Sequence, residues 1–121
     1  MRAVFLAAVL ALTGCGPVSQ WLAPHQEIAV ICAHVTAQNA GVTCVNAAYE
    51  LLNGEARVIQ QRYLDGLTTA DAREAARAQL DGYFATVEKA EYAVLLGDFT
   101  TAQGQLDGII AVLTALERKS Q

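Results

Sequence analysis

Three stretches of the chain carry apolar residues at helical spacing, and this pattern restricts the fold more than any other feature of the sequence. Steps of three and four residues place such side chains on one face of an α-helix. The apolar positions are Val45, Tyr49, Leu52, Ala56, Ile59 and Tyr63 in the first stretch, Ala72, Ala76, Leu80, Tyr83, Val87, Ala90 and Val94 in the second, and Ala102, Leu106, Ile109, Leu113 and Leu116 in the third. Helices with one apolar face must bury it, and short connections favour antiparallel neighbours. The sequence therefore predicts an antiparallel three-helix bundle.

Capping and turn residues set the expected limits of these helices. The first is expected over residues 44–65 with Thr43 as its N-cap, the second from Thr68 to about Leu96, and the third from Thr100 to about residue 118. Asp65-Gly66 and Gly97-Asp98 are the expected stops, with Gly66 in the left-handed conformation. Gly104 and Gly108 have small-residue spacing, which indicates close packing or a weak point early in the third helix.

A shorter helix is expected ahead of the bundle, over residues 24–39. Pro24 suits the first helical turn, and Asn39-Ala40-Gly41 is interpreted as a break. The β-branched residues Ile28, Val30 and Ile31 leave a strand as the alternative for this segment. The predicted fold class is thus all-α, an antiparallel three-helix bundle with an additional short N-terminal helix, in a helical domain of residues 24–119.

The first fifteen residues have the pattern of an export signal. Met1-Arg2 precedes an apolar run from Ala3 to Leu12. As a helix rising ~1.5 Å per residue, this run crosses about half of a ~30 Å hydrocarbon core, which is too short for a membrane span and suitable for a signal peptide. Leu12-Thr13-Gly14-Cys15 follows directly. This tetrapeptide resembles the lipobox of bacterial lipoproteins.

The lipobox resemblance implies how the N-terminus is processed. Residues 1–14 would be a cleaved signal peptide, the Cys15 thiol would carry diacylglycerol, and the new amine would receive a further acyl chain such as palmitate. Two or three acyl chains hold a protein durably on a membrane. Residues 15–23 would then form a lipidated cysteine and tether. Gly16 follows Cys15 where an Asp would favour the inner membrane, so the resemblance implies the outer membrane in a Gram-negative host, with the domain facing the periplasm or the cell surface.

The two remaining cysteines, Cys32 and Cys44, form an even pair in a protein expected to be exported, which predicts a disulfide. A bridge requires the two Cα atoms to lie within ~7 Å. An uninterrupted helix over residues 24–39 would hold Cys32 too far from Cys44. The disulfide therefore requires either that the first helix stops near residues 34–36 or that the loop doubles back.

Composition and charge exclude several classes of function. The hydrophobic fraction of 54% is too high for an intrinsically disordered chain. The net charge of −4, without a basic cluster, argues against nucleic-acid binding and against electrostatic binding to anionic lipid. Membrane attachment is therefore expected only through the lipid anchor on Cys15.

No motif in the chain indicates catalysis, a cofactor or a metal. His25 and His34 are the only histidines, and they lack the spacing of zinc ligands with the cysteines. Glu88 and Glu91 could act as an acid–base pair, but their position beside a surface stripe favours a solvated face. We therefore expect no enzyme, no cofactor and no metal site.

Aromatic residues suggest two places where the protein meets other molecules. Phe84 and Tyr92 fall beside the main stripe of their helix, which makes them a candidate partner surface. Trp21 and Leu22 follow residues 16–20 of the tether, and two interpretations of this pair stay open. They either lie at the membrane interface, which suits an indole ring, or pack against the bundle.

The function predicted from these features is that of a membrane-anchored lipoprotein. It would act as a non-enzymatic binding or structural module in the bacterial cell envelope, with another envelope protein as its expected partner. One alternative is a phage-encoded envelope lipoprotein for superinfection exclusion or lysis, because small lipoproteins of this appearance are common in phage genomes. The other alternative is a soluble periplasmic binder of a small ligand.

Overall fold

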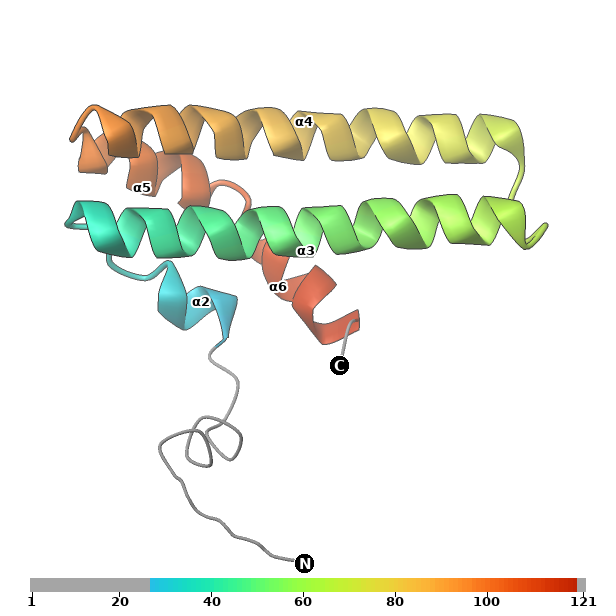
Figure 1. Cartoon of the computed structure of the whole chain (residues 1–121), viewed down its shortest axis with the longest axis horizontal. Helices are drawn as coiled ribbons and strands as arrows, with labels where there is room; N and C mark the ends of the chain where they lie inside the picture. The colour runs from blue at the N-terminus through green and yellow to red at the C-terminus, as the bar shows by residue number, and fades with distance from the viewer. Residues whose placement is uncertain (1–26, 120–121) are drawn as a thin grey trace, which may run out of the picture.

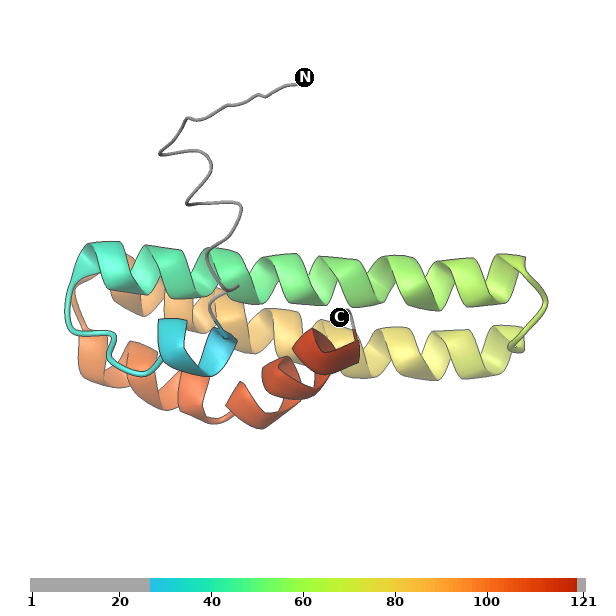
Figure 2. The same cartoon turned by 90° about the horizontal axis from the view of Figure 1, so that it is seen from below.

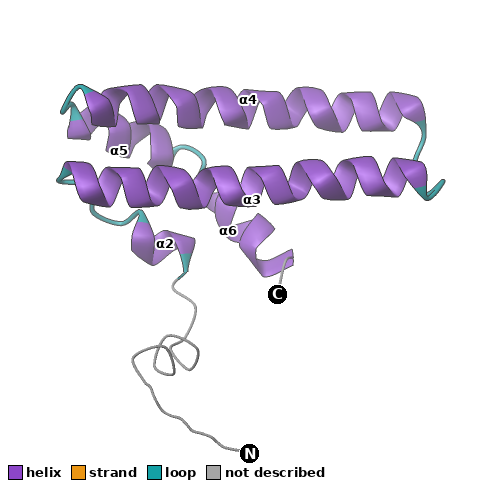
Figure 3. Cartoon of the chain, viewed as in Figure 1, coloured by secondary structure: helices purple, strands orange, loops and turns teal. Residues whose placement is uncertain are grey.

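The computed structural model describes residues 27–119, which form five helices and no strand (Figure 3). The helices are α2 (Ile28–Ile31), α3 (Gln38–Leu64), α4 (Ala70–Leu95), α5 (Phe99–Asp107) and α6 (Ile110–Lys119). The two longest, α3 and α4, run antiparallel and side by side (Figures 1 and 2). The all-α bundle that the sequence predicts is confirmed.

The shorter helices cover one side of the α3–α4 hairpin. α5 packs mainly on α4, α6 packs on α3, and α2 fits between α3 and α6. Figure 2 shows α2, α5 and α6 together on one side of the hairpin, and no helix of residues 27–119 covers the opposite side. The bundle thus has a third layer made of two short helices in place of one long helix.

The predicted apolar stripes form the core of this arrangement. The buried members are Val45, Leu52 and Ile59 from α3, Leu80, Val87, Ala90 and Val94 from α4, and Ala102, Leu106, Ile109 and Leu113 from the third layer. Between Ile59 and Leu80 no residue is buried. The stripe positions Tyr63 and Ala76 are therefore only half-buried, and Ala72 is exposed. The turn end of the hairpin extends past α6 and lacks a third layer (Figure 1).

The expected break at Asn39-Ala40-Gly41 and the expected N-cap at Thr43 are both wrong. α3 begins at Gln38 after the N-cap residue Ala37 and passes through Gly41 without interruption. The Thr43 hydroxyl donates to the Asn39 carbonyl oxygen at 2.9 Å, inside the helix. Gly41 is present for packing, because a Cβ at this position would lie 2.6 Å from Cγ2 of Val94. Here glycine permits close approach of two helices and does not end one.

The helix expected over residues 24–39 is much shorter in the described part of the chain. α2 is a single turn, and residues 32–37 form a connecting loop. The β-branched residues of this segment lower its helix propensity, and long-range contacts hold the loop. The helix stops at Ile31, before the limit that the disulfide requires, so Cys32 and Cys44 can meet.

The expected helix ends at Gly66 and Gly97 are confirmed, whereas the starts of α4 and α5 each differ by one or two residues from the expected ones. Gly66 and Gly97 have φ values of 73° and 78°, in the left-handed region. The N-cap of α4 is Thr69, whose side chain accepts from the Ala72 N–H, and not Thr68. The N-cap of α5 is Asp98, which accepts from the Thr101 N–H, and not Thr100. An aspartate carboxylate is a stronger acceptor than a threonine hydroxyl for the positive end of a helix.

The single helix expected from Thr100 to residue 118 is divided in two. Residues 108 and 109 form a turn between α5 and α6, and Figure 2 shows α6 leaving the line of α5. Gly104 and Gly108 weaken this part of the chain as a helix. The division lets α5 pack on α4 while α6 crosses to α3. The weak point suggested by the sequence is therefore a bend in the structure.

Candidate functional site

Several predicted positions lie outside the described residues 27–119. These are Cys15, with the expected lipid, and Trp21, Leu22 and His25. Within the described residues, no helix is both long and apolar enough to cross a bilayer. The sites that the structure does position are the cysteine pair, the candidate partner surface and the paired carboxylates.

Cys32 and Cys44 form a disulfide that joins the end of α2 to α3. Their Cα atoms lie 5.0 Å apart, and both side chains are buried in the core. Because the bond lies inside the core, its effect is to fix the loop of residues 32–37 against α3. This is a structural role, and no third group of ligand chemistry joins the pair within residues 27–119.

Gln103 of α5 holds the same loop from the other side. Its Nε2 donates to the carbonyl oxygen of Cys32 at 2.9 Å, and its Oε1 accepts from the N–H of Val35 at 2.7 Å. One amide side chain therefore satisfies a backbone acceptor and a backbone donor of a loop that has no secondary structure of its own. His34, between these two contacts, is exposed and borders a shallow hollow between this loop and α5.

Glu117 is a buried carboxylate that the sequence analysis missed. Only 5% of its surface is exposed, and its Oε2 accepts from the N–H of Ile28 at 2.9 Å. Ile28 is the first residue of α2, so the carboxylate caps a helix that has no side-chain cap of its own. A signal was present, because Glu117 follows Leu113 by four residues and so continues the buried stripe. An acid at such a position must have a partner.

The paired carboxylates Glu88 and Glu91 are exposed on α4 and do not enclose a reaction site. Glu91 accepts a hydrogen bond of 2.9 Å from the Tyr49 hydroxyl of α3. Partial burial, this hydrogen bond and the negative charges of both glutamates raise the pKa of Tyr49 to about 12. Glu91 therefore links α4 to α3 through the Tyr49 hydroxyl, which is a structural contact.

Phe84 and Tyr92 have different surroundings. Phe84 is half-buried and stacks on Tyr49, with ring centroids 6.2 Å apart. Tyr92 is 66% exposed near the end of α4. The candidate partner surface is therefore not one continuous pair of rings, and only Tyr92 offers a large free area.

Tyr92 belongs to a group of exposed apolar side chains that we call the end patch. Its members are Val42, Tyr92, Leu95 and Leu96, which are 41% to 66% exposed. Leu95 and the C-cap residue Leu96 follow Tyr92 by three and four residues, so both lie on the same side of α4 as Tyr92. Val42 and Leu95 border one shallow hollow of about 30 Å³ between α3 and α4. The sequence could not find Val42 and Leu95, because they come together only once α3 and α4 are paired.

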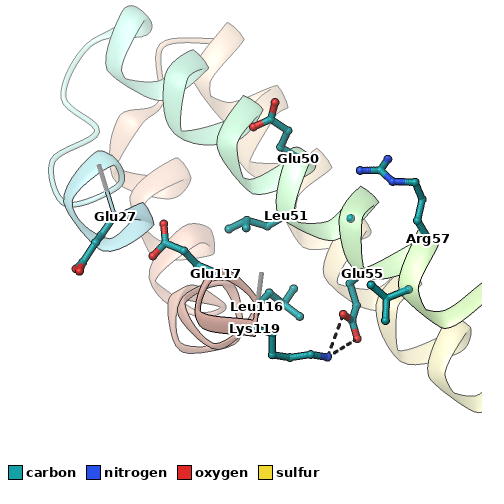
Figure 4. A pocket seen from close by; sticks show the side chains of 10 residues that line it. Glu27, Glu50, Leu51, Glu55, Arg57, Leu116, Glu117 and Lys119 are labelled. Atoms are coloured by element: carbon teal, nitrogen blue, oxygen red, sulfur yellow. Dashed lines mark hydrogen bonds and ion pairs between the residues drawn. The ribbon is translucent and has the colours of Figure 1, made fainter. Parts of the chain in front are cut away.

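A larger hollow, which we call the α3–α6 hollow, lies between those two helices beside the start of α2 (Figure 4). It has a volume of about 840 Å³. Leu51 and Val58 of α3 and Leu116 of α6 supply its large apolar wall. Its charged rim includes Lys119, which forms a 3.1 Å ion pair with Glu55. The hollow is a cavity that could take a side chain or a small ligand.

No protein-family model matches the chain, and searches of curated proteins and of solved structures returned no significant match. Function must therefore be argued from the end patch, the α3–α6 hollow and the N-terminal pattern.

Proposed function

We propose that the protein is a lipid-anchored, non-enzymatic binding module of the bacterial cell envelope, which contacts another envelope protein through the end patch. The observation that carries the binding role is the grouping of Val42, Tyr92, Leu95 and Leu96 on one exposed end of the α3–α4 hairpin. Contiguous exposed apolar side chains on a small domain commonly mark a protein-interaction site. The lipobox at Leu12–Cys15 supports the location.

The end patch also lies at the end of the α3–α4 hairpin where other elements pack on the two helices. The Cys32–Cys44 disulfide, the loop of residues 32–37 and α5 are all at this end (Figure 1). A rigid apolar surface loses little conformational entropy on binding. The exposed residues Leu64 and Leu67, at the opposite end, lie beside a turn without a third layer, and so offer a less ordered surface.

The test is site-specific photocrosslinking in intact envelopes. A photoreactive residue at Leu95 should give a discrete adduct with an envelope protein, and the same residue at Leu67 should give none. The two leucines are matched controls because they are 61% and 63% exposed. Leu96→Ser should weaken the Leu95 adduct, whereas Leu64→Ser should not. Equal labelling from Leu95 and Leu67 would reject the end patch as the binding surface.

The anchor is tested separately by fractionation and intact mass. Wild-type protein should be found in membranes with a mass that starts at Cys15 and includes acyl chains. Cys15→Ala should move the protein to the soluble fraction or leave it unprocessed. A processed Cys15→Ala protein that stays on the membrane would contradict the lipid anchor without affecting the binding test.

A periplasmic binder of a small ligand is the second candidate, because the α3–α6 hollow has the volume for one. Pockets for small ligands usually combine apolar walls with a few converging polar groups. Here Leu51 and Leu116 are flanked by Glu50, Glu55 and Arg57. A low-molecular-weight compound that is released on denaturation of protein isolated from its host would favour this candidate over the end patch.

A further inference from the structure

The α3–α6 hollow has an apolar wall that no described residue covers. Leu51 and Leu116 are half-buried on its two sides, and Val58 is 44% exposed at one end. Figure 4 shows Leu51 and Leu116 between the two helices, with charged side chains around them. An apolar strip inside a charged rim fits an apolar side chain and excludes a charged one.

Gly54 makes this hollow deeper. It lies on α3 among the lining residues, and a Cβ built on it would have only the terminal nitrogen of Arg57 within 4 Å, at 3.9 Å. Gly41, on the same helix, is different, because a Cβ there would collide with Val94. Packing among the described residues therefore requires glycine at 41 but leaves open space at 54.

The chain itself provides a suitable occupant. Glu27 is the first described residue and also borders the hollow, so the preceding segment starts at its wall. Trp21 and Leu22 are the adjacent large apolar pair of that segment, and Trp21 is the only tryptophan of the chain. The six residues from Trp21 to Glu27 can extend to about 20 Å. The wall from Glu50 to Val58 is about 12 Å long at the rise of a helix, so Trp21 can reach all of it.

We propose that Trp21, together with Leu22, docks in the α3–α6 hollow, so that the segment after Cys15 folds back on the domain. The indole then lies against Gly54 between Leu51 and Leu116, and the charged rim stays in water. Covalent attachment makes this contact intramolecular, which gives it a high effective concentration. The proposal holds whether or not Cys15 carries a lipid, and it would fix the orientation of the domain relative to any anchor.

Fluorescence of the single tryptophan tests the proposal on the full chain. The protein is placed in phosphatidylcholine vesicles with brominated acyl chains, and quenching of the selectively excited indole is compared with quenching by acrylamide in water. An indole in the hollow is shielded from both quenchers. Strong quenching by bromine would instead place Trp21 at the membrane interface, and strong quenching by acrylamide would place it in water. Either result overturns the proposal.

Two matched pairs of variants locate the shielded indole. Gly54→Leu fills the hollow and should increase quenching several-fold, whereas Gly82→Leu should not change it. A Cβ at Gly82 on α4 has nothing within 4 Å, and a Cβ at Gly54 meets only the Arg57 terminal nitrogen at 3.9 Å, so neither substitution begins with a clash against the backbone or the core. Val58→Glu should act like Gly54→Leu, because Val58 is 44% exposed on the wall of the hollow. Leu64→Glu is its control, because Leu64 is exposed on the same helix and does not line the hollow. Circular dichroism checks that each variant is folded. If the indole stays shielded in both Gly54→Leu and Val58→Glu, the hollow is not its binding site.

Discussion

At the scale of single residues, Gly41 has the most restricted position among the glycines of residues 27–119. It is buried where α3 approaches α4, and a Cβ there would lie 2.6 Å and 2.8 Å from the two methyl carbons of Val94. Val94 is itself 2% exposed and β-branched, so it has little freedom to move away. The close approach of α3 to Val94 of α4 at this point therefore depends on the absence of a methyl group at residue 41.

We expect Gly41→Ala to destabilise the domain relative to Gly82→Ala by about 1–3 kcal/mol, because overpacking a core costs that much. Gly82→Ala is the matched control, since it makes the same gain in helix propensity in open space. Urea unfolding with the disulfide intact measures the difference. Adding Val94→Ala to Gly41→Ala should recover part of the loss by making room for the methyl. Equal stability of the two single variants would disprove the close contact.

Tyr49 provides a residue-scale prediction on pH. Its folded pKa is raised from 10.0 to about 12 by partial burial, by the hydrogen bond to Glu91 and by nearby negative charge. A raised pKa favours the protonated form in the folded state, so this stabilisation is complete below pH 10 and is lost as the pH rises to about 12. Spectrophotometric titration should show one tyrosine that ionises late.

Tyr49→Phe is the control for this titration. It should remove the late tyrosinate signal. The free energy of unfolding of Tyr49→Phe should also fall less than that of the wild type as the pH rises from 10 to about 12. Other groups also lose protons at high pH, so the comparison between wild type and Tyr49→Phe isolates the contribution. A wild-type titration in which every tyrosine ionises together near pH 10 would contradict the Tyr49–Glu91 contact.

At the scale of elements, the loop of residues 32–37 depends on contacts with distant segments. Its anchors are the Cys32–Cys44 disulfide and the two hydrogen bonds of Gln103. Val35 is also buried, with 2% of its surface exposed. A segment of low helix propensity is thus ordered by one covalent bond, one amide and one buried side chain.

Gln103→Ala should therefore cost about 1–3 kcal/mol, because it leaves the Val35 N–H and the Cys32 carbonyl without their partner near the core. Gln79→Ala is the control. Gln79 makes only an exposed hydrogen bond of 3.2 Å to Tyr83, so its removal should change stability by less than about 0.5 kcal/mol. Thermal unfolding of both variants measures the contrast. Similar melting temperatures would show that water replaces the Gln103 contacts.

The sequence predicted the long elements well because their signals are local and repeated. The stripes from Val45 to Ile59 and from Leu80 to Val94 needed only helical spacing, and Gly66 and Gly97 needed only their place after a stripe. The helix starts were shifted, since several adjacent polar residues can serve as a cap and only the final backbone decides. Gly41 was interpreted as a break because its neighbour Val94 is distant in sequence.

The candidate site was less predictable for the same reason. Tyr92 was found from its position beside a stripe, but Val42 and Leu95 join it only once α3 and α4 are paired. Phe84 has the same kind of position as Tyr92, yet Tyr49 covers it. Glu117 and its partner Ile28 are 89 residues apart, so no local pattern connects them. Exposure and long-range pairing are tertiary properties.

At the scale of the whole molecule, order is expected to decrease along the α3–α4 hairpin. No residue between Ile59 and Leu80 is buried, and this end extends past α6 (Figure 1). At this end the Arg73 guanidinium of α4 lies 4.2 Å from the Tyr63 ring centroid of α3 and donates to Oε1 of Gln60 at 3.5 Å. Segments with few buried apolar contacts open more easily than the rest of a domain.

Hydrogen exchange read by mass spectrometry should show this gradient. Peptides from residues 60–76 should exchange at least about tenfold faster than peptides from residues 44–52 and 87–94, because local opening of the hairpin end does not require the core to unfold. Arg73→Ala should increase exchange at this end only. Uniform protection along α3 and α4 would mean that another surface, such as a second copy, covers the hairpin end.

The hydrogen bond between the Ile28 N–H and Glu117 holds α2 beside α6, and this has a practical consequence for labelling. A reporter fused after the C-terminus would emerge near α2, close to the N-terminal segment and to any membrane that holds it. The turn at Gly66 is on the far side of the domain (Figure 1), and a Cβ built on Gly66 meets nothing within 4 Å. An epitope inserted in this turn would keep both termini native and leave the end patch free.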